Sequence, residues 1–270
     1  MEKPLVSFIM GVYNTRNLND LKRSIDNMLN QTYPNIQVVI CDDGSTNHVF
    51  GFIQEHFGAD NRVKAIRREE NKGFAFTANE CLQLADGIYI ARQDDDDYSA
   101  ADRIDKQVAF LEMHPEYALV SAGLSKYDRN GIWSSIQLKE SPQKRDFRFH
   151  SQHVHAATLF RAETLRCVNG YRVSKETMRA EDYDLFMRIY AAGMKGYNLQ
   201  EILYYYNYPR GNVRRIKYYY KIREATVRRK GFCAMKLPII DYVYILKPLI
   251  AGLISEGAKQ KIKMMLCEKN

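Results

Sequence analysis

The sequence predicts an α/β fold built around a mostly parallel sheet, and two observations support this prediction. Short apolar runs that suit buried strands alternate with stretches of helical periodicity through the first 123 residues. Polar loops follow the ends of several of these runs. Such alternation is typical of right-handed βαβ units, whose strands run parallel and whose helices cover the sheet. A chain of 270 residues can bury the core that this fold needs.

The predicted elements follow in a regular order. Residues 5–10 form an apolar run, and residues 18–30 carry apolar side chains at helical spacing. The other strands expected in this part are residues 36–41, 63–67, 87–91 and 117–123. The other helices expected here are residues 49–57, 74–84 and 101–113.

Beyond residue 123 the pattern changes. An Asn-Gly turn at residues 130–131 between short apolar stretches predicts a hairpin. Residues 153–160 read as a strand with His153 and His155 on one face. With no Cys or Glu partner, we expect ordinary packing or contact with the acceptor rather than metal binding. The remaining expected elements are helices at residues 161–168 and 180–190 and a last strand at residues 202–208.

Four consecutive carboxylates, Asp94 to Asp97, follow the strand expected at residues 87–91. Adjacent carboxylates at the end of a buried strand offer oxygen ligands to a hard divalent cation such as Mg²⁺ or Mn²⁺. The alternative is a solvated acidic turn that caps the next helix.

Two other loops are expected to reach the same place. Asp42 and Asp43 follow the strand at residues 36–41, and Tyr13 and Asn14 follow the first strand. Ligands of parallel sheets bind beyond the carboxyl ends of the strands, so we expect all three loops to line one crevice.

A further acidic pair, Glu181 and Asp182, stands at the start of the helix at residues 180–190. One interpretation is an N-cap that pairs with the helix dipole. The other is a carboxylate placed to act as a general base.

Composition places the chain among ordinary globular proteins, with 46% hydrophobic and 27% charged residues. The net charge of +8 comes from residues 210–236, which hold ten Lys or Arg against one acid. Five scattered cysteines without CxxC spacing favour reduced thiols and argue against structural zinc. The chain runs from Met1 directly into the first strand, so we expect no signal peptide and a cytoplasmic location.

The strongly apolar residues 237–254 follow the basic segment. Asp241, Lys247 and Pro248 interrupt this stretch, so it does not predict a transmembrane helix. Basic residues beside an amphipathic apolar stretch suit an anionic membrane surface at the inner face of a cell membrane. The alternative is a helix pair that packs on the domain or in a homodimer.

The ordered motifs of this chain resemble those of the family-2 glycosyltransferases. The resemblance covers roughly residues 5–208. The motifs are residues 6–14, Gln31-Thr-Tyr-Pro-Asn35, Asp42-Asp-Gly-Ser-Thr46, Asn71-Lys-Gly73, Gln93-Asp-Asp-Asp-Asp97 and Glu181-Asp182. The resemblance implies a GT-A fold, with a Rossmann-like, mostly parallel central sheet flanked by helices and a C-terminal helical extension.

The resemblance also implies a division of the chain. Residues 1–208 would form the catalytic domain, with residues 1–123 binding the nucleotide-sugar and residues 124–208 binding the acceptor. Residues 209–270 would form a basic, amphipathic helical extension.

Family roles carry over to individual positions. Tyr13 would stack on the base, Asp43 would accept from the uracil imide N–H, Asp94 would lie at the ribose or the metal, Asp96 would be the principal metal ligand, and Asp182 would be the base. Donor contacts are also expected from Gly11, Asn14 and Lys72.

Three positions depart from the family pattern. Position 11 is Gly where many members have Pro, Ala78 stands where an Arg is frequent, and Asp95 replaces a small residue between the two acids. Lys72 is a candidate to replace the missing Arg, and any of Asp94 to Asp97 is a candidate ligand.

The resemblance implies an inverting enzyme that moves a sugar from a nucleotide-sugar, usually a UDP-sugar, to an acceptor hydroxyl with Mn²⁺ or Mg²⁺. We expect a glycan or lipid-linked glycan acceptor in bacterial surface polysaccharide or glycolipid synthesis. One competing hypothesis is a Mg²⁺-dependent nucleotidyltransferase, although the first loop lacks the expected lysine. Another is a nucleic-acid-binding protein that uses residues 210–236, although no recognition motif is present and we expect no nucleic-acid partner.

Overall fold

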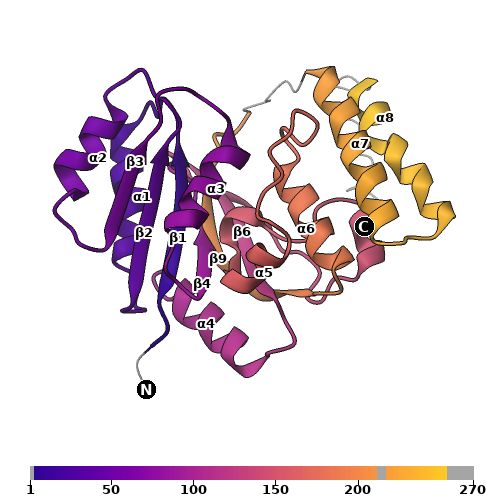
Figure 1. Ribbon diagram of the computed structural model, residues 1–270, viewed down its shortest axis with the longest axis horizontal. Helices are drawn as coiled ribbons and strands as arrows, with labels where there is room; N and C mark the ends of the chain where they lie inside the picture. Colours follow the sequence, from indigo (N-terminus) through magenta and orange to yellow (C-terminus); the bar gives the residue numbers. More distant parts are fainter. Residues whose placement is uncertain (1–2, 212–216, 254–270) are drawn as a thin grey trace.

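The computed structural model describes residues 3–211 and 217–253, and one sheet runs through the described chain (Figure 1). The strands are β1 (Val6–Val12), β2 (Ile36–Asp42), β3 (Val63–Arg67), β4 (Tyr89–Arg92), β5 (Tyr98–Ser99), β6 (Leu119–Asp128), β7 (Gly131–Ile136), β8 (Leu159–Arg161) and β9 (Gly196–Asn207). Their order in the sheet is β3-β2-β1-β4-β8-β6-β9-β5, and β7 pairs with β6.

Helices cover both faces of this sheet (Figure 1). The α-helices are α1 (Leu18–Leu29), α2 (Val49–Phe57), α3 (Phe74–Leu84), α4 (Arg103–Met113), α5 (Ala162–Cys167), α6 (Glu181–Ala191), α7 (Tyr218–Ala234) and α8 (Lys247–Leu253). Three short 3₁₀ segments are η1 (Lys144–Arg148), η2 (His155–Ala157) and η3 (Ile239–Leu246).

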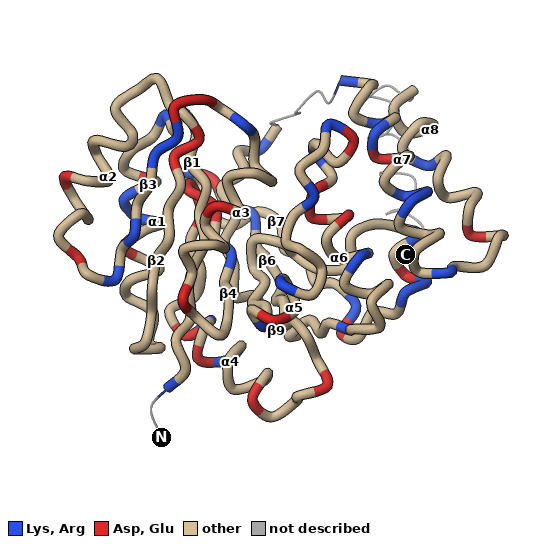
Figure 2. Tube along the Cα trace, viewed as in Figure 1, with Lys and Arg blue, Asp and Glu red and all other residues tan. Residues whose placement is uncertain are grey.

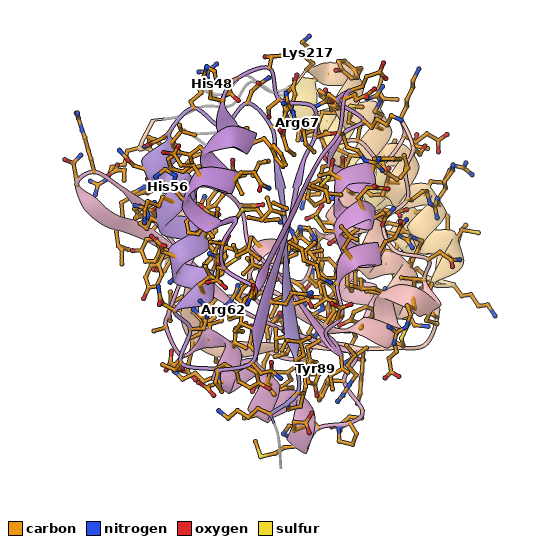
Figure 3. All side chains as sticks on the ribbon, turned by 60° about the vertical axis from the view of Figure 1, so that its left-hand side comes forward. His48, His56, Arg62, Arg67, Tyr89 and Lys217 are labelled. Carbon is orange, nitrogen blue, oxygen red and sulfur yellow. The ribbon has the colours of Figure 1, made fainter. Side chains whose placement is uncertain are left out.

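The N-terminal part of the sheet confirms the predicted parallel arrangement. Strands β3, β2, β1 and β4 are parallel neighbours, and Val12 lies opposite Asp42, which in turn lies opposite Arg67. Their carboxyl ends therefore share one edge. In Figure 3, Arg67 at the carboxyl end of β3 and Tyr89 at the amino end of β4 lie at opposite ends of the sheet.

Two hydrophobic clusters form the core, one on each face of the sheet. On β1, Phe8 and Met10 point to the cluster under α1, α2 and α4, whereas Ile9 points to the cluster under α3, α5 and α6. Successive side chains of a strand point to opposite faces, so a strand covered on both sides must be apolar throughout. This explains why the sequence shows continuous apolar runs here rather than alternation.

The antiparallel strands belong to the C-terminal half of the sheet. β8 pairs antiparallel with β4 and β6, and β5 pairs antiparallel with β9, while β6 and β9 run parallel. The predicted hairpin is confirmed as β6–β7. The boundary expected between residues 123 and 124 falls within β6. The assignment of residues 1–123 to the nucleotide-sugar and of residues 124–208 to the acceptor stays a prediction.

The prediction of a strand over residues 153–160 was wrong. Residues His155–Ala157 form η2, and the strand covers only Leu159–Arg161. The cause is tertiary, since His153 lies between the Asn198 side chain and the Tyr190 hydroxyl, at 2.7 and 3.0 Å from its ring nitrogens. The last strand also begins earlier than expected, at Gly196 rather than residue 202.

The C-terminal extension is helical in its described part and packs on the domain through α7 and η3. Phe232 and Val227 of α7 belong to the core cluster that contains α6. Arg228 is buried, and its Nη1 donates to the Arg148 carbonyl at 2.8 Å. Figure 2 shows Lys and Arg positions along α7. Among the described helices, none combines the length and apolar character needed to cross a bilayer.

Some predictions fall on other parts of the chain. Residues 212–216 and 254–270, which include Arg214, Arg215 and Cys267, lie outside the described residues.

Candidate active site

The loops after β1, β2 and β4 lie together, and direct hydrogen bonds tie them to one another. The Asn14 backbone N–H donates to Ser45 Oγ at 2.8 Å, and the Thr46 N–H donates to Asn14 Oδ1 at 2.9 Å. The Thr15 hydroxyl contacts the Asp95 carboxylate. Asn14 has φ of 48°, a left-handed conformation that Asn tolerates better than most residues. The structure therefore brings the three predicted loops together at one edge of the sheet.

A fourth segment joins them through Asp43. The two carboxylate oxygens of this buried residue accept the backbone N–H groups of Lys72 and Gly73 at 2.8 and 2.9 Å. The neighbouring Gly44 has φ of 73°, and a Cβ there would lie 2.6 Å from the Glu70 carbonyl carbon. The close approach of these backbones requires glycine, and it fixes where Asp43 can meet a ligand.

The other predicted nucleotide contacts surround this junction. Tyr13 is half-exposed, so its ring is open to a ligand. The Lys72 ammonium lies 5.2 Å from the centre of the Phe76 ring. Gly11 faces α3, where a Cβ would come within 3.0 Å of the Thr77 methyl carbon. Their contacts with a nucleotide stay predictions.

The four acids of the run occupy different environments. Asp94 pairs with Arg92, and Asp95 contacts Thr15. Asp96 is partly exposed, and its backbone carbonyl accepts from the Arg23 guanidinium at 3.2 Å. Asp97 is buried and accepts from the Tyr204 hydroxyl and the Asn207 backbone N–H at 2.9 and 2.8 Å.

Asp97 shows how much negative charge gathers here. Burial raises the pKa of Asp97 to about 8, and the charges of Asp94 and Asp96 act in the same direction. The shift therefore reflects chiefly the burial of Asp97, to which the two neighbouring carboxylates add.

The sequence analysis did not identify Arg92, which contacts several parts of the candidate site. This buried residue of β4 directs one guanidinium nitrogen at Asp94, another at the Gln93 carbonyl at 2.8 Å, and its guanidinium carbon lies 4.9 Å from the Phe74 ring centre. Its position at the end of an apolar strand, two residues before an acid, was the available signal.

Asp182 lies in the first turn of α6 and is partly exposed. Burial raises the pKa of Asp182, and the positive charge of Arg92 partly opposes this effect. Tyr171 links the two parts, because both Asp94 and Asp182 raise the pKa of its buried phenol. The start of α6 and the end of β4 therefore lie within electrostatic range of each other.

Neighbouring polar residues have structural roles. Arg188 pairs with Asp184 at 2.7 Å and donates to the Gly170 carbonyl at 2.7 Å, which agrees with the structural role expected for it. Burial lowers the pKa of His155 well below its usual value, and Arg92 adds to this effect. With His153 held in its own buried network, both histidines serve packing, as expected.

The donor set at the crevice fits a hard divalent cation that also takes substrate phosphates. Across residues 3–211 and 217–253, no three or more His, Cys, Asp or Glu side chains gather to hold an ion by themselves. Mg²⁺ sites of nucleotide enzymes commonly use one or two carboxylates plus phosphate oxygens, and Asp94 and Asp96 could supply these.

Comparison with known sequences decides the family. The family model described as Glycosyl transferase family 2 matches residues 7–168, more than half of the chain. The protein is a member of glycosyltransferase family 2. This family 2 glycosyltransferase is 38% identical to the putative glycosyltransferase EpsE of Bacillus subtilis strain 168 over 248 residues, 92% of this chain and 88% of the relative.

A second relative is the Escherichia coli UDP-Glc:alpha-D-GlcNAc-diphosphoundecaprenol beta-1,3-glucosyltransferase WfaP. It is 29% identical over 209 residues, 77% of this chain and 78% of the relative. Membership of the family decides against the nucleotidyltransferase hypothesis.

Solved structures confirm the GT-A fold of this family 2 glycosyltransferase. Staphylococcus aureus TarS 1–349 in complex with UDP-GlcNAc matches with a TM-score of 0.68 and 16% identity, covering 92% of this chain and 71% of TarS. The mannosyltransferase PcManGT of Pyrobaculum calidifontis in complex with GDP-Man and Mn²⁺ matches with a TM-score of 0.61 and 17% identity, covering 98% and 80%.

Proposed function

We propose that this glycosyltransferase moves a sugar from a UDP-sugar to an acceptor hydroxyl, with a divalent cation at the diphosphate and inversion at the anomeric carbon. The observation that carries the proposal is that Arg92 pairs with Asp94 of the acidic run after β4, while its positive charge also acts on Asp182 in the first turn of α6. The acidic run suits binding of a cation and phosphates. Asp182 suits removal of a proton.

The donor would lie over the joined loops. Tyr13 would stack on the uracil ring, and Asp43, held by the Lys72 and Gly73 amides, would accept from the imide N–H. Lys72 would approach the diphosphate. The TarS complex with UDP-GlcNAc supports a uridine donor, while the PcManGT complex with GDP-Man shows the alternative nucleotide on this fold.

Asp96 and Asp94 would hold Mn²⁺ or Mg²⁺. The cation supplies charge neutralisation for the leaving nucleoside diphosphate. The protein's own contribution is to hold carboxylates at the end of β4, where their mutual repulsion favours a bound cation. Arg92 offsets part of this charge, because it pairs with Asp94.

Asp182 would remove the proton from the acceptor hydroxyl. Its raised pKa makes it a stronger base than an ordinary aspartate. With Asp182 as the single base and no nucleophilic side chain required, the acceptor hydroxyl attacks in one in-line displacement. This displacement inverts the anomeric centre.

The acceptor we propose is a lipid-linked glycan of bacterial surface polysaccharide or glycolipid synthesis, and the transferred group a hexose or N-acetylhexosamine. The name of the relative WfaP, which specifies a diphosphoundecaprenol acceptor, supports this class. Such an acceptor suits an enzyme at the inner face of the cell membrane. Dimerisation through the extension stays a separate prediction.

The test is to incubate the full chain with UDP-sugars and Mn²⁺ and to follow UDP release. We expect release with at least one UDP-sugar, loss with EDTA and recovery with added Mn²⁺. Asp96→Asn should weaken Mn²⁺ activation at least tenfold, with Asp60→Asn, an acid before β3 that pairs with Arg62, as the control. A preference for GDP-sugars would overturn the uridine donor, and EDTA-resistant transfer would remove Asp96 from its role.

A further inference from the structure

The exposed aliphatic side chains of the described residues are unevenly distributed. Single residues such as Ile88, Met113 and Val173 stand apart on the surface, which is normal. Six others fall within one short segment of the extension, and we call them the aliphatic stripe: Ile239, Ile240, Val243, Leu246, Ile250 and Leu253.

Local geometry places five of these residues, all except Ile239, in one row. In a 3₁₀ helix, side chains three positions apart eclipse, which aligns Ile240, Val243 and Leu246 along η3. The chain then continues as α8, where Ile250 and Leu253 follow Leu246 at steps of four and three. These five residues therefore form a continuous row over both elements.

The opposite face of η3 is anchored, so the stripe cannot turn inward. Asp241 is buried and accepts from Arg145 Nε at 2.8 Å and Arg148 Nη1 at 3.0 Å. Tyr244 packs edge-on against Phe149 with ring centres 5.2 Å apart, and Tyr242 contacts Phe232. These contacts fix the rotation of the segment and leave the aliphatic row outside.

The surroundings of the stripe are basic and aromatic. Lys236 is exposed directly before it. At its other end, a Cβ on Gly252 would meet the Tyr218 ring at 2.9 Å and Lys221 Cγ at 3.3 Å, so these α7 side chains border α8. Residues 210–236, which precede the stripe, carry ten basic residues and one acid.

From this arrangement we infer that the aliphatic stripe docks the protein onto an anionic lipid bilayer. The row of aliphatic side chains would enter the acyl boundary, while the lysines meet anionic headgroups and the tyrosines lie at the interface. A second copy of this chain is a less suitable partner for the stripe than a bilayer. A two-fold dimer places the same patch opposite itself, so the basic segments would face each other. The inference does not depend on the proposed reaction.

The experiment is co-sedimentation of the full chain with vesicles of phosphatidylcholine and phosphatidylglycerol, compared with phosphatidylcholine alone. We expect binding to the anionic vesicles that added salt weakens. Ile240→Ser with Val243→Ser should lower the vesicle-bound fraction at least tenfold. The matched control is Met113→Ser with Ile132→Ser, because exposures of 70% and 56% there resemble the 70% and 62% of the stripe pair.

Three results would overturn the inference. The wild-type chain could fail to bind anionic vesicles, or both double variants could bind equally well. Light scattering could instead show a wild-type dimer that only the stripe variant dissociates, without vesicle binding. Vesicle binding needs no turnover, so failure here and failure of the proposed reaction are distinguishable.

Discussion

The crevice at the carboxyl ends of β1, β2 and β4 and the surface of the C-terminal extension depart from ordinary protein chemistry in opposite ways. The crevice buries ionisable groups, since Arg92 and Asp97 lie in the interior next to further carboxylates. The extension exposes apolar side chains, as at Ile240 and Val243.

The contrast teaches where function is to be sought in this molecule. Buried charge and exposed aliphatic rows each cost free energy unless something else compensates for them. A cation with phosphates would compensate for the first, and a bilayer would compensate for the second. The core around β1 and β2 is largely apolar, and it needs no such partner.

The largest expected effect tests Asp182, the acid assigned as the base. Asp182→Asn should reduce sugar transfer by about 10²–10⁴-fold, because the acceptor hydroxyl loses its base. UDP-dependent thermal protection should persist, since the residue is not assigned to the donor. The measurement is single-turnover transfer beside a thermal unfolding curve.

Glu181→Gln is the matched control for this change, as the adjacent acid of the same helix turn. It should keep most of the activity. Since burial raises the pKa of Asp182, the wild-type rate should rise with pH through a midpoint above that of an ordinary aspartate. Full turnover by Asp182→Asn would contradict the assignment.

The next effect separates the two faces of the extension. Phe232→Ala should lower the free energy of unfolding by about 3–5 kcal/mol, because the ring is fully buried against the α6 cluster. Ile240→Ala on the exposed stripe should change it by less than about 0.5 kcal/mol. Urea unfolding of both variants provides the comparison, and equal losses would show that the stripe is packed.

The smallest effect concerns pH and the buried histidine network. Burial lowers the pKa of His153 to about 4, whereas an unfolded histidine has a pKa near 6.5. The unfolded chain therefore takes the proton first as pH falls. The contribution of the neutral, buried His153 to the free energy of unfolding is fully present above pH ~6.5. It is lost as the pH falls toward ~4, with a slope of at most about 1.4 kcal/mol per pH unit.

His153→Gln removes the one proton that this side chain takes up on unfolding, so it should reduce the slope of the free energy of unfolding against pH. The measurement is urea unfolding at several pH values. His48→Gln, on an exposed histidine, is the control and should leave the slope unchanged. An unaltered slope in His153→Gln would mean that the histidine is protonated in the folded protein.

Much of the fold could be predicted because its signals are local. The helices at residues 49–57 and 74–84 and the strand at residues 63–67 agree with the structure at both ends. Parallel order then places the loops after β1, β2 and β4 at one edge, which is why Asn14 and Ser45 could be expected to meet.

Other features depended on residues far away in the chain. Residues 153–160 carry the pattern of a strand, yet His153 is held by Asn198 and Tyr190, and the segment becomes a loop with η2. The burial of Arg92 could not be predicted from its neighbours Gln93 and Asp94, because it also depends on the packing of β4 against Phe74 of α3.

The sequence by itself determined the alternation of strands and helices, the family, and the acids that stand at the strand ends. Only the tertiary structure decided that Asp43 is held by the Lys72 and Gly73 amides, that Arg92 pairs with Asp94, and which face of residues 237–253 remains outside. The physical reason is that periodicity records the average environment of a segment, whereas a buried polar group or an exposed apolar row depends on the particular partners that packing provides.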